Sequence, residues 1–120
     1  MPARIVIVQG SPRRDGNTDR AVQRLEAGLS RVVDCSVVRL ADLVVSRCSG
    51  CRRCMTDGVC AIGDDDFPGL WEELRAARGI VQACPVYWLS PPGIMKDFID
   101  RTHSTYTRRA TLAGVPCWLL

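Results

Sequence analysis

The chain has 120 residues, of which 47% are hydrophobic and 24% are charged, and its formal net charge is +3. These values are typical of one globular domain that is large enough to bury a core. The basic side chains are scattered among acids, which argues against a nucleic-acid-binding protein. No apolar run approaches the roughly 20 residues of a membrane-spanning helix, and no signal-peptide core follows the N-terminus. We therefore expect a cytoplasmic protein.

The N-terminal segment 4–18 predicts a strand, a tight loop and the start of a helix. The β-branched run 4–8 is short and stiff enough to be a buried strand. The residues from Gly10 to Asn17 are of types that turn the backbone, and from Thr18 the apolar residues recur at helical spacing. Such a unit aims unpaired N–H groups and the positive end of a helix dipole at one place, which favours phosphate binding.

The composition of this loop narrows the kind of phosphate that it would bind. It lacks the lysine and the spacing of a nucleoside-triphosphate loop, and it does not have the glycine spacing of a dinucleotide fingerprint. A single terminal phosphate bound without metal fits better, with donors and charge from Ser11, Asn17, Thr18 and Arg13 or Arg14. The alternative is that Asn17 or Thr18 only caps the helix.

The rest of the chain alternates between predicted strands and helices. In order, we expect a helix over 18–30, a strand over 35–40, a polar cysteine-rich connection over 41–65, a helix capped by Asp66, a strand over 79–84, a helix over 94–101 and a strand over 115–120. This order predicts an α/β domain with a parallel sheet and helices on both of its faces. Ligands of such sheets bind beyond the carboxyl ends of the strands.

The loop after the third predicted strand is unusually apolar, with the sequence Pro85-Val86-Tyr87-Trp88. It should lie at the same edge of the sheet as the phosphate loop, because both follow the carboxyl end of a parallel strand. A phosphate site beside aromatic side chains describes a site for a mononucleotide such as FMN. The alternative is that the aromatic side chains only form a hydrophobic lid over the next helix.

The seven cysteines fall into two groups. Cys35, Cys84 and Cys117 lie singly in apolar segments, where we expect them to be buried in the core. The other four follow the spacing C-x2-C-x2-C-x5-C and are Cys48, Cys51, Cys54 and Cys60. Closely spaced thiolates are what an iron–sulfur cluster requires, whereas a zinc site and a metal-free loop are the alternatives.

Two features of the cysteine segment fit a bound cluster. Gly50 and Gly58 would let the backbone wrap a compact ligand. Arg52 and Arg53 would then lie beside the cluster, where they would tune its potential or dock an acidic partner protein.

The chain resembles the NAD(P)H-dependent FMN reductases of the flavodoxin-like superfamily in three segments, which are the phosphate loop (residues 10–18), the block 85–88 and the run 95–101. Its cysteine connection resembles the iron–sulfur flavoprotein branch of that family. The resemblance covers residues 1–120 as one FMN-binding domain, with a cysteine-rich insertion over 47–65. It implies a doubly wound parallel sheet of strand order 2-1-3-4 and a homodimer or homotetramer. It also implies FMN with its phosphate and ring held by the two loops, NAD(P)H as the co-substrate and a [4Fe-4S] cluster on the four cysteines.

The resemblance implies an oxidoreductase that passes electrons from a nicotinamide through FMN to a quinone, a flavin or a protein acceptor. Because the flavin carries this chemistry, no side chain is assigned as catalytic. We expect Lys96, Asp100 and Arg101 to make contacts between helices or subunits, and His103 to be an ordinary polar residue. The alternative function is a non-enzymatic flavin or iron–sulfur electron carrier or redox-sensing subunit.

The family's domain has five strands, whereas this sequence predicts four. The last predicted strand is apolar and would leave an unpaired sheet edge, which is an aggregation hazard unless something covers it. We expect further polypeptide or a partner chain to complete that edge. The alternative is a shortened relative of the family that binds flavin poorly.

Overall fold

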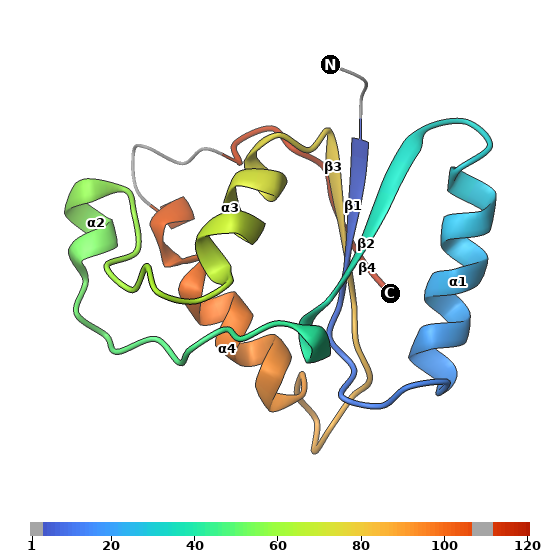
Figure 1. Ribbon diagram of the computed structural model, residues 1–120, viewed down its shortest axis with the longest axis horizontal. Helices are drawn as coiled ribbons and strands as arrows, with labels where there is room; N and C mark the ends of the chain where they lie inside the picture. The colour runs from blue at the N-terminus through green and yellow to red at the C-terminus, as the bar shows by residue number, and fades with distance from the viewer. Residues whose placement is uncertain (1–3, 107–111) are drawn as a thin grey trace.

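A four-stranded parallel sheet in the order β2-β1-β3-β4 forms the centre of the computed structural model, which describes residues 4–106 and 112–120 (Figure 1). Its elements are β1 (Arg4–Gln9), α1 (Asn17–Leu29), β2 (Asp34–Arg39), the 3-10 helix η1 (Leu40–Asp42), α2 (Arg53–Asp57), α3 (Phe67–Arg75), β3 (Gly79–Ala83), α4 (Gly93–Arg101), the 3-10 helix η2 (His103–Tyr106) and β4 (Cys117–Leu119). The predicted α/β class, parallel sheet and strand order are confirmed.

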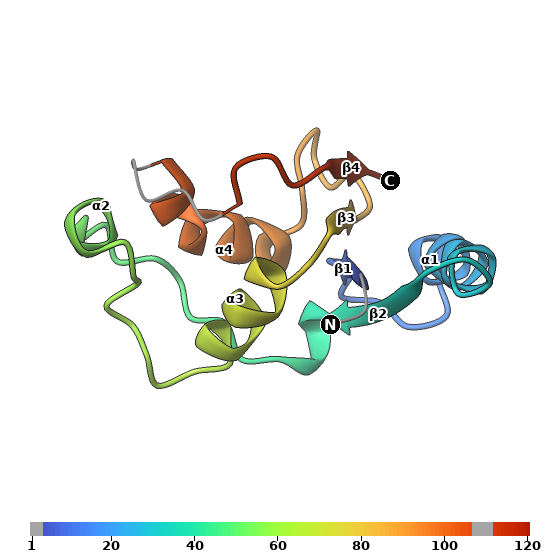
Figure 2. The ribbon, with the colours of Figure 1, turned by 90° about the horizontal axis from the view of Figure 1, so that it is seen from above.

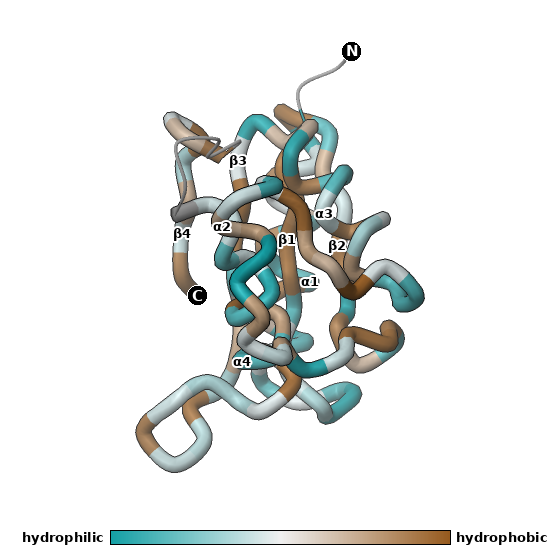
Figure 3. Tube along the Cα trace, turned by 90° about the vertical axis from the view of Figure 1, so that its left-hand side faces the viewer, coloured by the Kyte–Doolittle hydropathy of each residue, from teal (hydrophilic) through white to brown (hydrophobic). Residues whose placement is uncertain are grey.

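The helices cover both faces of the sheet, as Figure 2 shows from above: α1 lies on one face, and α3 and α4 lie on the other. Under α1 a small core forms around Ile7 and Val22. Under α3 and α4 a larger core includes Val6, Phe67 and Phe98. Both faces of β1 are therefore buried, which explains its continuous apolar sequence and its hydrophobic trace in Figure 3.

The predicted cysteine environments are only partly correct. Cys35 and Cys84 are half-buried, as residues at the margin of a core are, but Cys117 is exposed. The prediction for Cys117 is wrong because β4 is an edge strand and all three of its residues are exposed. Apolar sequence context alone therefore overstated the burial of this residue.

An apolar groove remains on the α1 face beside β4. It has a volume of about 330 Å³, and its lining is Ile5, Leu25, Leu29, Val81, Trp118, Leu119 and Leu120. Trp118 and Leu119 are exposed although they are large and apolar. Within the described residues, no helix combines the length and the apolar character needed to cross a bilayer.

Gly10 fixes the distance between the phosphate loop and α4. A Cβ atom at this position would lie 2.8 Å from Met95 Sδ and 2.9 Å from Met95 Cβ. Because Met95 is 1% exposed and its Cβ is anchored to the helix, it cannot move away without shifting α4. Only glycine allows the loop to leave β1 this close to the helix.

We expect Gly10→Ala to lower the free energy of unfolding by about 1–3 kcal/mol, because the added methyl group overpacks the core. Gly28→Ala is the matched control, since nothing lies within 4 Å of a Cβ at that helical position. It should raise the free energy of unfolding by about 0.5–1 kcal/mol through helix propensity. Urea denaturation measures both changes, and equal effects of the two substitutions would contradict the close-packing argument.

Candidate functional site

The phosphate loop begins at a junction between β1 and β3. The Gly10 N–H donates to the Ala83 carbonyl at 2.7 Å, so the loops after the two strands start side by side. Further along, the Ser11 N–H donates to Gln9 Oε1 at 2.9 Å and the Arg13 N–H donates to Ser11 Oγ at 3.2 Å. These bonds consume amides in the first half of the loop and give it a fixed shape.

The second half of the loop is open where α1 begins. The N-cap residue is Gly16, in an extended conformation and with no side-chain cap, so the alternative that Asn17 or Thr18 merely caps the helix is wrong. The N–H groups of the first helical turn have no intrahelical partners. Asn17 is exposed and Thr18 is half-buried, so both lie where an anion would meet the positive end of the helix dipole.

A buried carboxylate supports the loop from below. Asp19 is 4% exposed and accepts hydrogen bonds from Gln9 Nε2 and from the Asp15 N–H, both at 2.6 Å. It also forms an ion pair with Arg39 Nη1. The hydrogen bond from Arg39 lowers the pKa of Asp19 despite the opposing effect of burial. Asp15 turns the loop with a φ of 58°, a conformation that aspartate tolerates.

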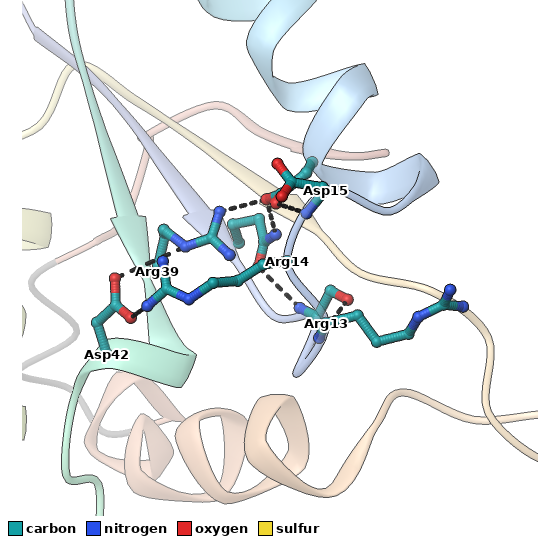
Figure 4. Close-up of polar contacts among 8 residues, drawn as sticks. Arg13, Arg14, Asp15, Arg39 and Asp42 are labelled. Carbon is teal, nitrogen blue, oxygen red and sulfur yellow. Dashed lines mark hydrogen bonds and ion pairs between the residues drawn. The ribbon is translucent and has the colours of Figure 1, made fainter.

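The two arginines of the loop have different surroundings. Arg14 forms an ion pair with Asp42, next to Arg39, whereas the Arg13 side chain extends away from this network (Figure 4). Within residues 4–106 and 112–120, Arg13 forms no ion pair. Arg13 is therefore the arginine whose charge is available to a ligand.

The ion pair of Asp19 with Arg39 predicts a pH-dependent stability. The folded-state pKa of Asp19 lies below its ordinary value of 3.8, so its contribution is present above that value and is lost as the pH falls through the folded pKa. We expect Asp19→Asn to lower the free energy of unfolding at pH 7 by about 1–3 kcal/mol and to flatten its acid dependence.

The matched control for this substitution is Asp34→Asn, which breaks a surface pair with Arg4. Its effect should stay below about 0.5 kcal/mol, because exposed ion pairs contribute little. Urea denaturation from pH 7 to pH 3 measures both variants. Identical pH profiles for the wild type and Asp19→Asn would contradict this account.

The apolar loop after β3 forms a tight hairpin. Tyr87 and Ser90 exchange backbone hydrogen bonds of 2.8 and 3.1 Å, and the two residues between them have positive φ values, 50° at Trp88 and 63° at Leu89. Trp88 is 98% exposed and Leu89 is 97% exposed. The lid alternative does not describe Trp88, because a lid residue would be covered by the helix beneath it.

The structure brings the two predicted halves of the mononucleotide site to one edge of the sheet. Ser11, Arg13, Asn17 and Thr18 follow β1, the hairpin block Pro85, Val86, Tyr87 and Trp88 follows β3, and the bond from Gly10 to Ala83 joins the two loops at their origin. Their role in binding a phosphate and a flat ring stays a prediction.

The four clustered cysteines line one cavity of about 220 Å³. The loop turns around this cavity through left-handed residues, namely Gly50 at φ 71°, Arg52 at φ 63° and Gly58 at φ 75°. The positions of both glycines thus agree with the wrapped backbone that the sequence predicts. Ile62, Arg101 and His103 complete part of the lining. Burial raises the pKa of the Cys54 thiol, and the other three cysteines add to that rise.

In the part of the chain that the structure describes, no group of three or more His, Cys, Asp or Glu side chains is arranged so that it could hold a metal ion. A tetrahedral zinc site would need all four sulfurs at about 2.3 Å from one ion. A polynuclear cluster needs wider spacing, because each sulfur binds a different iron.

Arg101, at the end of α4, contacts the cysteine loop. Its guanidinium has no exposed area and forms a bidentate ion pair with Asp65, with Nη1 at 2.6 Å from Oδ2 and Nη2 at 3.2 Å from Oδ1. Its Nε donates to Cys60 Sγ at 3.2 Å. Arg101 also contacts another helix, as expected, because its guanidinium carbon lies 4.5 Å from the centre of the Phe67 ring of α3. Lys96 and Asp100 instead form an exposed ion pair with each other.

The electrostatics of this buried pair favour the charged forms. Burial by itself would lower the pKa of Arg101, but the hydrogen bonds to Asp65 and Cys60 outweigh it and raise that pKa. The hydrogen bond from Arg101 holds the pKa of Asp65 far below its ordinary range. Arg52 and Arg53 have a different place: Arg52 lines the cavity, and Arg53 forms an exposed ion pair with Asp57.

The sequence pattern of the NADPH-dependent FMN reductases matches residues 3–119. The chain belongs to this family. Two curated relatives are iron–sulfur flavoproteins, one from Methanosarcina thermophila with 33% identity over 92% of this chain and 56% of that protein, and one from Clostridioides difficile with 28% identity over 94% of this chain and 51% of that protein. These relatives confirm the predicted iron–sulfur flavoprotein branch. The chain spans about half the length of the curated relatives it matches.

Solved structures confirm the flavodoxin-like fold of this FMN reductase family member. An NAD(P)H:quinone oxidoreductase from Methanothermobacter marburgensis aligns with a TM-score of 0.72 and 16% identity, over 91% of this chain and 58% of that chain. An FMN-dependent NADH-azoreductase from Bacillus anthracis aligns with a TM-score of 0.70 and 11% identity, over 97% of this chain and 67% of that chain.

The sequence did not reveal which residues support the candidate site from behind. These are Gln9, Asp19 and Arg39 under the phosphate loop and Asp65 behind the cysteines, where its partner Arg101 was expected only to make contacts between helices or subunits. One signal was available, because Asp19 falls in the first turn of a helix where a loop amide needs an acceptor. The pairing of Asp65 with Arg101 spans 36 residues, and no local pattern reports it.

Proposed function

We propose that this member of the FMN reductase family is an NAD(P)H-dependent oxidoreductase that passes electrons from a nicotinamide through FMN to a quinone, a flavin or a protein acceptor. The observation that carries the proposal is the junction of the Gly10 N–H with the Ala83 carbonyl, at 2.7 Å. It joins a loop with open phosphate donors to a loop with exposed aromatic side chains at the carboxyl edge of the sheet. The similarity to quinone and azo reductases of the same fold supports this assignment.

The phosphate end of the site has the donors that an FMN phosphate needs. The amides at the start of α1 and the side chains of Asn17 and Thr18 lie at the open half of the loop. The Arg13 side chain is exposed, and its guanidinium forms no ion pair with any residue that the structure describes. Ser11 Oγ accepts the Arg13 N–H and so fixes where that residue leaves the loop. Arg39 neutralises the buried Asp19 carboxylate, which would otherwise repel an anion.

The ring end of the site would be formed by the hairpin block 85–88. Its left-handed turn presents the Trp88 side chain to solvent at the sheet edge, beside the origin of the phosphate loop. When bound, FMN supplies the hydride chemistry, and the chain's own residues bind it, orient it and limit the access of water.

The cysteine loop would hold a [4Fe-4S] cluster through Cys48, Cys51, Cys54 and Cys60. The support from the structure is that all four cysteines line one cavity. The curated relatives carry the name iron–sulfur flavoprotein, which supports the same group here. Such a cluster supplies one-electron transfer.

A second copy of the chain would complete the FMN reductase as a homodimer or homotetramer. Two apolar surfaces support this part of the proposal. They are the hairpin tip at Trp88 and Leu89, and the groove beside β4 that Trp118 lines. Contiguous exposed apolar surface of this kind favours protein contacts.

Asn17→Asp tests the phosphate site. The substitution places a negative charge at the first residue of α1, where an acidic side chain suits the helix dipole and folding should not suffer. We expect the FMN affinity to fall at least about tenfold, because like charges repel, whereas riboflavin, which lacks the phosphate, should bind equally to both proteins. Gln23→Glu adds the same charge farther along α1 and should leave the FMN affinity unchanged. Fluorescence titration measures each affinity, and an equal loss for both flavins would contradict the phosphate assignment.

Two further measurements separate enzyme from carrier and cluster from zinc. Anaerobic NADPH should bleach the flavin absorbance within seconds for an enzyme, whereas the flavin of a carrier would stay oxidised.

Anaerobically purified protein should contain about four iron and four sulfide per chain. Cys54→Ser should abolish this content, and Cys35→Ser, outside the loop, should retain it. Zinc without sulfide, or no metal at all, would contradict the cluster.

A further inference from the structure

The cysteine loop leaves the body of the protein at Ser46 and returns to it at Asp65, and one side chain binds both ends. Arg101 Nη1 donates to the Ser46 carbonyl at 2.9 Å and Nη2 donates to the Ile62 carbonyl at 2.9 Å. The bidentate pair with Asp65 adds the remaining contacts at the returning end. The guanidinium is thus the point at which the loop is closed.

Asp65 extends this closure to the loop backbone. Its Oδ2 accepts the Ser46 N–H at 2.8 Å and its Oδ1 accepts the Phe67 N–H at 3.1 Å. The Phe67 ring lies 4.5 Å from the Arg101 guanidinium carbon, which packs the cation against the core. All of these contacts at the base of the loop involve the buried side chain of Arg101 or of Asp65.

The other contacts that hold the loop are fewer and more exposed. Arg47 forms an ion pair with Asp97 of α4, and just outside the base Val44 and Asp66 are joined by two hydrogen bonds. The loop's only α-helix, α2, has no buried residue, and among the four clustered cysteines only Cys60 packs against the core under α3 and α4. Ordering a loop that buries little apolar surface costs conformational entropy, and burial offsets only a small part of that cost. The ion pair between Arg101 and Asp65 therefore restricts the loop in the way that a buried apolar face restricts other segments.

Arg101 also contacts a sulfur directly. Its Nε lies 3.2 Å from Cys60 Sγ, and the guanidinium is charged at every pH at which the protein folds. Hydrogen bonds to ligand sulfurs are one of the factors that set the reduction potential of an iron–sulfur centre. A cationic donor stabilises the more negative, reduced state.

We propose that Arg101 is the positioning residue of the cysteine loop: it closes the loop through Asp65 and, through its hydrogen bond to Cys60, raises the reduction potential of a cluster held there. The closure stands on the contacts of this chain alone. The second half rests on the proposed function, because it needs the cluster.

Hydrogen exchange on the metal-free protein tests the closure. Arg101→Lys keeps the charge but loses the fork that reaches Asp65, Ser46 and Ile62 together. We expect the amide of Ser46 to exchange at least about tenfold faster in this variant, whereas the amides of β1 keep their protection. Lys96→Met, on the exposed side of α4, is the matched control and should change neither. Unchanged exchange at Ser46 in Arg101→Lys would overturn the closure.

A second variant keeps the test decisive if Arg101→Lys does not fold. Arg101→Met combined with Asp65→Leu replaces the buried pair by apolar side chains, an exchange that often preserves stability. We expect this double variant to fold, with an unfolding midpoint close to that of the wild type, but with fast exchange at Ser46. Full protection of the loop in this variant would overturn the closure.

Redox titration of the protein with its cluster tests whether Arg101 raises the reduction potential. Both variants should reduce less readily, by about tenfold in the equilibrium constant, which is about 59 mV for one electron. An unchanged potential in both would overturn the role of the hydrogen bond to sulfur. If the wild type holds no iron, the proposed cluster and this second half both fail, while the exchange data still decide the closure.

Discussion

The buried ion pair between Arg101 and Asp65 is the interaction on which the cysteine end of this protein depends. Neither side chain is accessible to water, at 0% and 2% exposure, so each charge requires the other. A buried pair of this kind contributes little net stability, but the loss of one partner leaves an uncompensated charge. The pair between Arg101 and Asp65 matters for its geometry, because the guanidinium reaches both ends of a loop that has almost no core of its own.

The phosphate end of the molecule follows the same rule. Asp19 and Arg39 form a second inward-facing pair, and they fix a loop whose outer half stays open to a ligand. In both places the groups predicted to contact a ligand are exposed or line a cavity, and a buried ion pair holds their segment in position. A rigid support behind an open face is the arrangement that preorganises a binding site.

Local sequence signals predicted most of the fold and the outlines of the site. The β-branched run of β1, the turn residues after it and the helical spacing of α1 agree because each is a short-range preference. The short spacing of the four clustered cysteines likewise explains why they line one cavity. Contacts between residues that are distant in the sequence could not be predicted from local patterns. The partner of Asp65 lies 36 residues away, and the burial of Cys117 depends on whether β4 has a neighbour on both sides.

The long separation of Asp65 from Arg101 also dictates an order of assembly. Residues 46–65 are synthesised well before residue 101, and the base of their loop cannot close until α4 has docked on the sheet. Until α4 has docked, the guanidinium cannot reach both ends of the loop, and the cysteine segment lacks the contact that closes its base.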